Sequence, residues 1–195
     1  MASKVIKIKK KTMKTVMFFS VFFVVMTVIF FGFLSILKTL YPISYADFVE
    51  NNASENNLQK SFVYAVIKCE SGYDERAVSY ADARGLMQLT PETFRWLQSK
   101  KGEKLSEEML FDPETNIRYG CYFYGTLFEI YDDEATAIAA YHAGMGNVSK
   151  WLKDERYSKD GKTLYDIPFK NTKKYVNRVI ETKKIYSILY NGKED

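Results

Sequence analysis

The 195-residue chain predicts a mainly α single domain behind an N-terminal transmembrane helix. Three features favour this fold class: an uncharged apolar run near the N-terminus, helical spacing of apolar residues through most of the remainder, and no run that alternates convincingly as a strand. The composition, 47% hydrophobic and 27% charged, excludes disorder along the whole length. We therefore expect one core of moderate size.

The apolar run fills residues 16–37 and reads VMFFSVFFVVMTVIFFGFLSIL. At a rise of about 1.5 Å per residue it is long enough to cross a bilayer core. Lysines crowd the preceding residues 1–15, which predicts a cytoplasmic basic tail and an extracytoplasmic remainder in the cell membrane. A cleaved signal peptide is the alternative, with small residues around Ser44 and Ala46, but the run exceeds the usual length of about 7–15 residues. We expect an uncleaved single-pass anchor.

Residues 38–56 are polar and contain Pro42 and several asparagines, which predicts a linker. The globular domain is expected over residues 57–190. Thr90 and Asp112 are each followed by proline and therefore predict two helix starts, with a loop and a small hairpin in the segment 73–90. Helical spacing predicts helices over these segments: 58–71, from 91, 113–131, 134–142, 148–153 and about 172–190.

The charge distribution narrows the class of protein. The net charge of +4 falls to −3 when the seven lysines before residue 41 are left out, so the body is mildly acidic and a nucleic-acid partner is not expected. One histidine, His142, and two cysteines without close spacing predict no metal site. No GxSxG, Walker-type or GxGxxG motif is present, so no cofactor is expected either. Carboxylates remain the main supply of acid and base groups.

Glu70 is the most informative carboxylate. It ends an apolar-faced helix, next to Cys69 and before Gly72. The negative end of the helix dipole and partial burial both disfavour a charged carboxylate, so its pKa should rise. A carboxyl group that stays protonated near neutral pH suits a general acid for glycosidic cleavage. The alternative is a solvated residue at a helix end, without a catalytic role.

Five motifs follow Glu70-Ser71 in order along the body: AVS at 77–79, GLMQLTPET at 85–93, DPETNI at 112–117 with Gly120, AYHAG at 140–144 with GNV at 146–148, and IPF at 167–169 with Thr172 and Tyr175-Val176. This succession resembles the soluble lytic transglycosylase family. The resemblance covers essentially the whole body and implies a lysozyme-like α+β catalytic domain, mainly helical.

Carried over residue by residue, the family's lone catalytic acid corresponds to Glu70. The resemblance implies that Met87 and Gln88 face the sugar and that Ser79 helps to hold the muramyl N-acetyl group. Aromatic rings suit sugars because they offer apolar faces and a polar hydroxyl. A structural role, in capping and close helix packing, is implied for Asp112, Pro113, Asn116 and Gly120.

Tyr141 and Tyr175 match tyrosines that border the catalytic acid, and two departures from the family pattern lie beside them. The family usually has Asn where His142 stands, so His142 either donates the same hydrogen bond or adds a pH sensitivity. The family commonly has Glu where Asn171 stands. Asn171 is expected to cap the final helix, and it leaves no second catalytic carboxylate at that position.

The resemblance implies a membrane-anchored peptidoglycan lytic transglycosylase whose partners are glycan strands. It would cleave the bond between N-acetylmuramic acid and N-acetylglucosamine and form a 1,6-anhydro ring, with Glu70 acting first as acid and then as base. A hydrolase would instead need a second carboxylate. A muramidase that uses water and a catalytically weak peptidoglycan-binding scaffold remain the alternatives.

Cys69 and Cys121 lie on expected helices that can touch. A disulfide between them is permitted outside the cell. Two small buried thiols are the simpler alternative.

Overall fold

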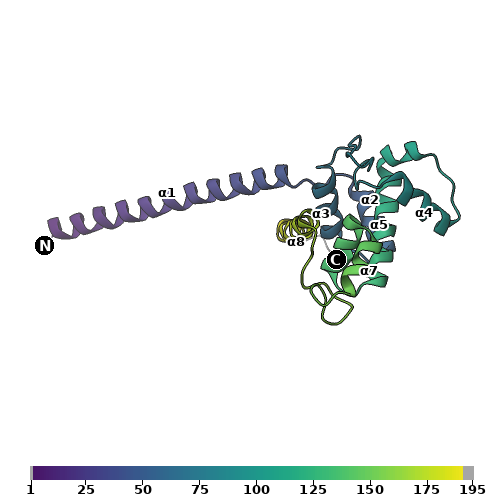
Figure 1. Cartoon of the computed structure of the whole chain (residues 1–195). Coiled ribbons are helices and arrows are strands. Elements are labelled where there is room, and N and C mark those ends of the chain that lie inside the picture. The colour runs from purple at the N-terminus through teal and green to yellow at the C-terminus, as the bar shows by residue number, and fades with distance from the viewer. Residues whose placement is uncertain (1, 191–195) are drawn as a thin grey trace. The chain divides into compact units, whose positions relative to one another are not determined.

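The computed structural model describes residues 2–190, with side chains from residue 13 onward, and divides into two compact units, Met1–Pro42 and Ile43–Asp195. The first unit is one long helix, α1 (Ala2–Leu40), drawn in purple in Figure 1. Its segment Met13–Leu40 has the length and composition of a membrane span, a test that a signal sequence near the N-terminus also passes. The apolar run of the sequence therefore forms the expected helix, with its large apolar side chains exposed.

The second unit is helical. Its elements are α2 (Ala46–Glu55), α3 (Lys60–Glu70), α4 (Pro91–Lys101), the 3₁₀ helix η1 (Glu107–Phe111), α5 (Pro113–Ile130), α6 (Glu134–Ala143), α7 (Met145–Leu152) and α8 (Lys170–Tyr190). Over the described residues no strand forms. The only pairing of extended chain there is two isolated antiparallel bridges, Val78 with Arg84 and Arg84 with Leu89, within the loop where a small hairpin was expected. The mainly α prediction is confirmed.

The linker prediction for residues 38–56 is wrong over its second half, because residues 46–55 form α2 and pack on α3 and α5. Val49 and Ala53, four residues apart, are fully buried and give the helix a narrow apolar face. Asn52 is buried beside them, and its amide donates to the Phe48 carbonyl at 2.8 Å. An apolar face this narrow is hidden among polar residues, so the composition of the segment resembles that of a linker.

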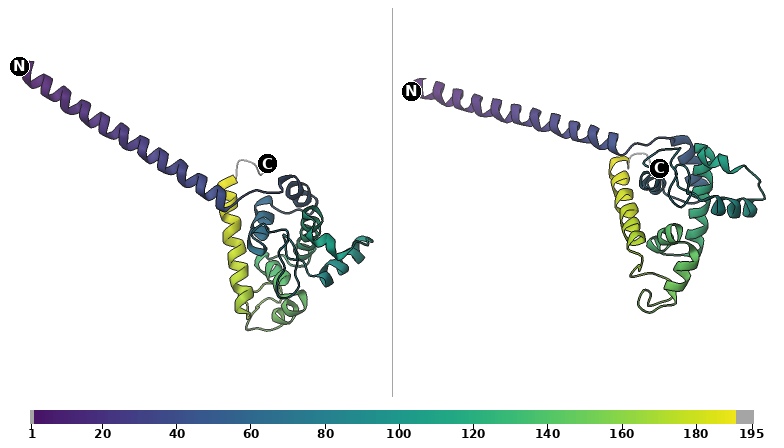
Figure 2. Two further views of the ribbon diagram at one scale, coloured as in Figure 1. Left: turned by 90° about the horizontal axis from the view of Figure 1, so that it is seen from above. Right: turned by 45° about the horizontal axis from the view of Figure 1, so that its top comes forward.

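The core lies between α5 and the helices around it. α5 packs on α2, α4, η1 and α6, while α3 packs most extensively on α8, which also contacts α6. Figure 2 shows α8, in yellow, running along one side of this unit. The end of α3 is therefore brought next to α6 and α8, helices that lie far from it in the sequence.

Two helices begin where their capping residues predict. Thr90 Oγ1 accepts a hydrogen bond from the Thr93 amide at 3.2 Å, and Asp112 Oδ2 accepts from the Thr115 amide at 2.8 Å. Proline occupies the first turn in both cases, where the missing N–H costs nothing. These local signals are sufficient to predict the helix starts, because each capping hydrogen bond involves only the next three residues.

Asn116, on α5, holds the loop before α4 in place. Its buried side chain donates to the carbonyls of Arg84 (2.9 Å) and Leu110 (2.7 Å) and accepts from the Met87 amide (2.7 Å). Gly85 passes directly over it at φ +73°, where a Cβ would lie 2.1 Å from the Leu110 carbonyl oxygen. The glycine and the asparagine of these two motifs therefore form one structural unit.

Both cysteines are free thiols. Cys121 is fully buried in α5, and burial raises the pKa of its thiol. The Cys69 thiol, which is half-buried, donates to Thr182 Oγ1 on α8 at 3.6 Å. The structure therefore contains two separate thiols rather than the disulfide.

Candidate active site

The end of α3 is held by a serine. Ser71 Oγ donates to the Leu86 carbonyl at 2.9 Å and accepts from the Tyr73 amide at 3.1 Å, which ties the helix end to the loop that Asn116 supports. Gly72, at φ +62°, then turns the chain away. Glu70 is consequently the last residue of a helix whose preceding turns are buried.

The Glu70 carboxyl group lies against α8. The Tyr175 hydroxyl donates to Glu70 Oε1 at 2.5 Å. Burial raises the pKa of Glu70 to about 7, although this hydrogen bond and the positive charge of Arg178 both lower it. The rise expected from the sequence is confirmed, and burial is its main cause. Near neutral pH this carboxyl group can therefore either give up or take up a proton.

Tyrosines connect Glu70 to the opposite loop. The Tyr175 and Tyr124 hydroxyls lie 3.2 Å apart, and the Tyr124 ring stacks on the Tyr141 ring with centroids 4.1 Å apart and planes 6° apart. The Tyr141 hydroxyl donates to the Met87 carbonyl at 2.6 Å. Tyr124 lies on the helix expected over residues 113–131 but was not among the expected site residues. Its signal as a site residue was that a buried tyrosine hydroxyl needs a polar partner.

Met87 does not face the sugar as expected, since its side chain is fully buried. A Cβ at Gly120 of α5 would lie 2.3 Å from the Met87 sulfur, so the thioether fills the space that the missing side chain leaves. Only the Met87 backbone contributes to the site, through the carbonyl that accepts from Tyr141.

Gln88 and Ser79 lie in the loop between α3 and α4. Gln88 is partly exposed at φ +50°, and its amide nitrogen donates to the carbonyls of Ala77 (3.1 Å) and Gly85 (2.9 Å). Ser79 is exposed, and its hydroxyl accepts from the Ala83 amide at 3.0 Å, which closes a turn. Both side chains stabilise loop structure, and neither makes a direct contact with Glu70 in the part of the chain that is described.

His142, near the end of α6, stands beside Tyr175. The ring centroids are 4.5 Å apart, and His142 Nδ1 lies 3.1 Å from Thr172 Oγ1 on α8. The side chain reaches solvent on one side, but partial burial, together with the positive charge of Arg178, lowers its pKa. His142 is therefore neutral near pH 7, and its hydrogen bond to Thr172 links α6 to the start of α8.

Two open pockets adjoin this histidine. One, of about 440 Å³, is lined by His142, Phe169, Lys170 and Asn171 among others. The second, of about 340 Å³, is lined by His142, Asn171, Lys174, Tyr175 and Arg178. Asn171 lies in the first turn of α8 and not at its cap, because the helix already begins at Lys170.

Arg178 was not expected at the site. Its guanidinium donates to the Cys69 carbonyl at the end of α3 at 2.7 Å and lies 5.9 Å from the centre of the Tyr175 ring. Its spacing of three residues after Tyr175 is the signal that would have found it, because residues three apart share a helix face.

The structure thus brings Glu70, Tyr141, His142 and Tyr175 together from α3, α6 and α8, whereas Ser79 and the Met87 side chain lie apart from this group. Over residues 13–190, no three His, Cys, Asp or Glu side chains gather as metal ligands would. In the part of the chain that is described, a partly buried carboxyl group held by a tyrosine and lying near open pockets is an arrangement suited to acid–base chemistry.

The family comparison agrees with this class. Residues 47–164, more than half of the chain, match the family model described as the transglycosylase SLT domain. The chain belongs to this family, as its motif order predicted. The match begins within α2, which agrees with the docking of that helix on the domain.

Curated relatives carry related names. A putative soluble lytic murein transglycosylase of Haemophilus influenzae is 34% identical over 162 residues, which is 80% of this chain and 27% of the relative. The soluble lytic murein transglycosylase of Escherichia coli K12 is 30% identical over 74% of this chain and 23% of its own length. A membrane-bound lytic murein transglycosylase C of Histophilus somni is 27% identical over 77% of this chain and 48% of its own length.

Solved structures show the same fold. An inactive mutant of the lytic transglycosylase Slt from Pseudomonas aeruginosa matches with a TM-score of 0.70 at 31% identity, over 80% of this chain and 26% of that chain. The 70 kDa soluble lytic transglycosylase of Escherichia coli matches with a TM-score of 0.71 at 26% identity, over 81% and 26% of the two chains. The present chain spans about a quarter of the length of the first two curated relatives and of these two structures.

Proposed function

We propose that this protein is a peptidoglycan lytic transglycosylase that cleaves the bond between N-acetylmuramic acid and N-acetylglucosamine, with Glu70 acting as acid and then as base. The observation that carries the proposal is the partly buried Glu70 carboxyl group, which accepts a hydrogen bond from Tyr175 and whose pKa of about 7 suits both roles. Membership of the SLT family and the names of the relatives support it.

In the first step Glu70 protonates the glycosidic oxygen. A retaining hydrolase would place a second carboxylate about 5 Å away as nucleophile. Here the charged group that acts on Glu70, in the described part of the chain, is the cation Arg178, and position 171 carries no charge. The muramyl N-acetyl group stabilises the positive carbon instead, so the substrate supplies what the protein lacks.

In the second step the ionised Glu70 takes the proton of the muramyl 6-hydroxyl, whose oxygen closes the 1,6-anhydro ring. The Tyr175 hydroxyl donates to Oε1 and therefore stabilises the carboxylate that the first step creates. Oε2 is left for the sugar. Tyr141 and Tyr124 stack behind Tyr175 and restrict its movement.

We further propose that α1 stays in the cell membrane, with the N-terminus cytoplasmic and the SLT domain outside. The length of the apolar helix, the lysines before it and a relative named as membrane-bound support this topology. Protease added to intact cells should remove the domain and leave a membrane-embedded fragment. A domain that resists protease in intact cells contradicts the orientation, and a mature protein that starts near Asp47 contradicts the anchor.

Glu70→Gln tests the chemistry. The variant keeps the shape of the side chain and an oxygen for Tyr175, yet it can neither donate nor accept the reacting proton. It should stay folded, bind glycan strands and lose turnover by about three or more orders of magnitude. The matched control is Glu181→Gln, which removes an exposed carboxylate of α8 and should leave turnover unchanged.

Mass analysis of the products separates the alternatives. The wild-type protein should release muropeptides that end in 1,6-anhydro-N-acetylmuramic acid, lighter by one water than hydrolysis products and without a reducing end. Reducing-end products would identify a muramidase. Strand binding without products would identify a scaffold, and near-normal turnover by Glu70→Gln would remove Glu70 from both roles.

A further inference from the structure

The first turns of α8 carry positive charge where it does not stabilise the helix. Lys170, Lys174 and Arg178 recur every four residues and therefore share one face of α8, here called the α8 cationic face. The first turn contains no acidic residue, although the positive end of the helix dipole favours acids there. The surrounding body carries a net negative charge, so these cations stand out from it.

Two other lysines of α8 are paired with carboxylates. Lys173 forms an ion pair with Asp166 at 2.6 Å, and Lys183 pairs with Glu134 at 2.8 Å. For Lys170 and Lys174, both exposed, the structure shows no ion pair with the residues it describes. Their charges are therefore available to a ligand in solution.

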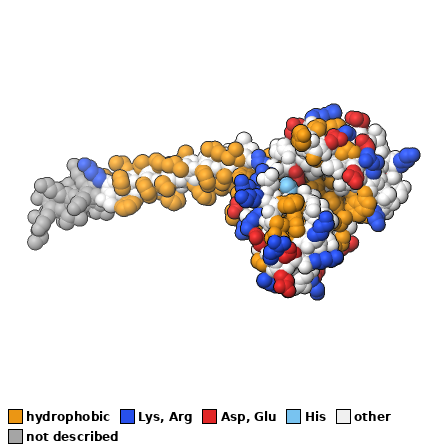
Figure 3. All heavy atoms as spheres, in the orientation of Figure 1, with side chains coloured by type: hydrophobic (Ala, Val, Ile, Leu, Met, Phe, Trp, Pro, Cys, Tyr) orange, Lys and Arg blue, Asp and Glu red, His pale blue; other side chains and the backbone are white. Residues whose placement is uncertain are grey.

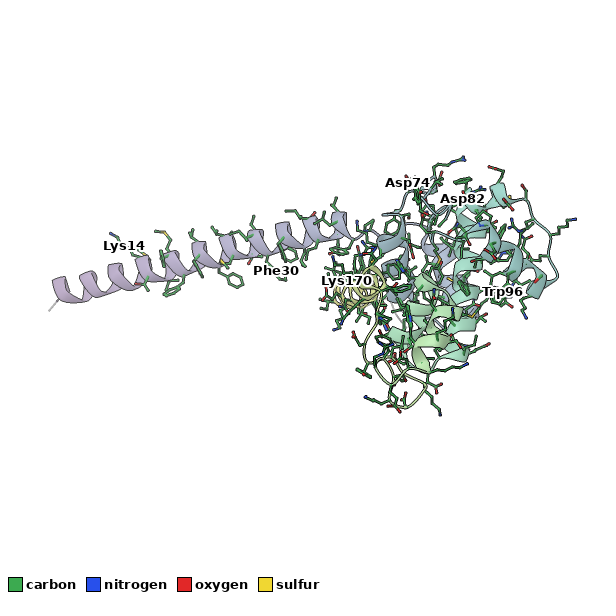
Figure 4. All side chains as sticks on the ribbon, viewed as in Figure 1. Lys14, Phe30, Asp74, Asp82, Trp96 and Lys170 are labelled. Carbon is green, nitrogen blue, oxygen red and sulfur yellow. The ribbon has the colours of Figure 1, made fainter. Side chains whose placement is uncertain are left out.

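The α8 cationic face borders the two open pockets. Lys170 lines the first pocket, Lys174 and Arg178 line the second, and both pockets share His142 and Asn171. Figure 3 shows the pale blue histidine at the surface with Lys and Arg side chains gathered beside it, and Figure 4 labels Lys170 on α8. The second pocket is also lined by Tyr175, whose hydroxyl contacts Glu70. The cationic face thus continues directly from the candidate active site.

We propose that Lys170, Lys174 and Arg178 bind carboxylates of the stem peptide carried by the muramyl residue at the cleaved bond. This inference rests on the proposed function. Uncharged sugar rings give these cations no counter-ion, whereas the stem peptide is covalently attached to the sugar that must lie over Glu70 and brings free carboxylates with it. The uncharged Asn171 between the two pockets adds no repulsion to an arriving carboxylate.

Binding should be measured without turnover, using the full-length chain in detergent with the Glu70→Gln substitution in every sample. The ligands are peptide-bearing glycan strands, strands from which an amidase has removed the peptides, and peptide-bearing strands whose carboxylates have been amidated. We expect the chain to bind the first ligand about tenfold more tightly than the other two, a preference that weakens with salt.

The variant Lys170→Gln/Lys174→Gln should lose this preference, because two exposed charge contacts account for about a tenfold change in affinity. Lys170→Arg/Lys174→Arg should retain it. The matched control is Lys173→Gln, one position from Lys174 on the same helix, whose charge is paired with Asp166 and which lines neither pocket. It should bind all three ligands as the parent does.

Several outcomes would overturn the inference. If the parent chain binds peptide-bearing and amidated strands with equal affinity, stem-peptide binding is rejected directly. This comparison does not depend on whether the lysine variants fold. An equal loss by the double glutamine variant on all three ligands would make the lysines sugar contacts. Failure of the proposed function would show separately, as absence of products from the wild-type chain.

Discussion

Glu70→Gln is expected to remove a pH dependence of domain stability between about pH 4.5 and pH 7. Burial raises the pKa of Glu70 from 4.5 to about 7, so in this window the folded domain holds a proton that the unfolded chain has lost. The contribution of Glu70 to the free energy of unfolding is therefore fully present below pH 4.5 and is lost as the pH rises to about 7. The glutamine of the variant has no such proton to lose.

The magnitude follows from the difference between the two pKa values, 4.5 and about 7, which corresponds to about 3 kcal/mol of unfolding free energy. Other groups titrate alike in both proteins, so the difference in unfolding free energy between wild type and variant isolates Glu70. That difference should change by about 3 kcal/mol from about pH 4 to about pH 8, with the wild type losing stability relative to the variant.

The assay is urea denaturation of the full-length chain in detergent at several pH values, followed by the fluorescence of Trp96 and Trp151, which both lie in the SLT domain. Glu181→Gln is the control, since it removes an exposed carboxylate and should follow the wild type at every pH. A constant difference between wild type and Glu70→Gln across this pH range would show that Glu70 titrates like a solvated carboxyl group. The acid role built on its burial would then be rejected.

Three further substitutions test the site and its support. Tyr175→Phe removes a hydrogen bond that lowers the pKa of Glu70, so the alkaline limit of the pH–rate profile should move upward while turnover falls about 10- to 100-fold; an unmoved limit contradicts the contact. Asn116→Ala leaves the Met87 amide and the Leu110 carbonyl without a partner, whereas the Arg84 carbonyl still accepts from the Leu89 amide, and it should cost about 2 kcal/mol or more in urea denaturation. Gly85→Ala, at φ +73° with a backbone oxygen 2.1 Å from the new Cβ, should destabilise the domain by several kcal/mol. The control Gly161→Ala, at φ +72° with its nearest atom at 3.9 Å, should cost only about 1 kcal/mol. Equal losses of unfolding free energy in the two variants would show that crowding at Gly85 has no effect.

Local chemistry explains which features could be predicted. The apolar run, the capped helix starts at Thr90 and Asp112 and the position of Glu70 at a helix end each depend on a few consecutive residues or on one helix. The order of motifs added the family. These features do not require knowledge of what lies across the domain.

Long-range packing explains which features could not be predicted from the sequence. Sequence reasoning placed Met87 in the sugar cleft, but the space above Gly120 on another helix turns its side chain inward. It also treated residues 46–55 as linker. Val49 and Ala53 stabilise this segment only because α2 packs on α3 and α5, and that packing cannot be read from the segment itself.

The sequence by itself determined the helical class, the apolar N-terminal helix, the family and the position of one carboxyl group at a helix end, since periodicity, capping and motif order are properties of neighbouring residues. Only the tertiary structure decided what surrounds that carboxyl group. Tyr175, 105 residues away in the chain, reaches Glu70 because α8 packs along α3, and the same packing brings Arg178 to the end of that helix. The size of the rise in the Glu70 pKa comes from burial by distant segments, and no short stretch of sequence contains those segments together.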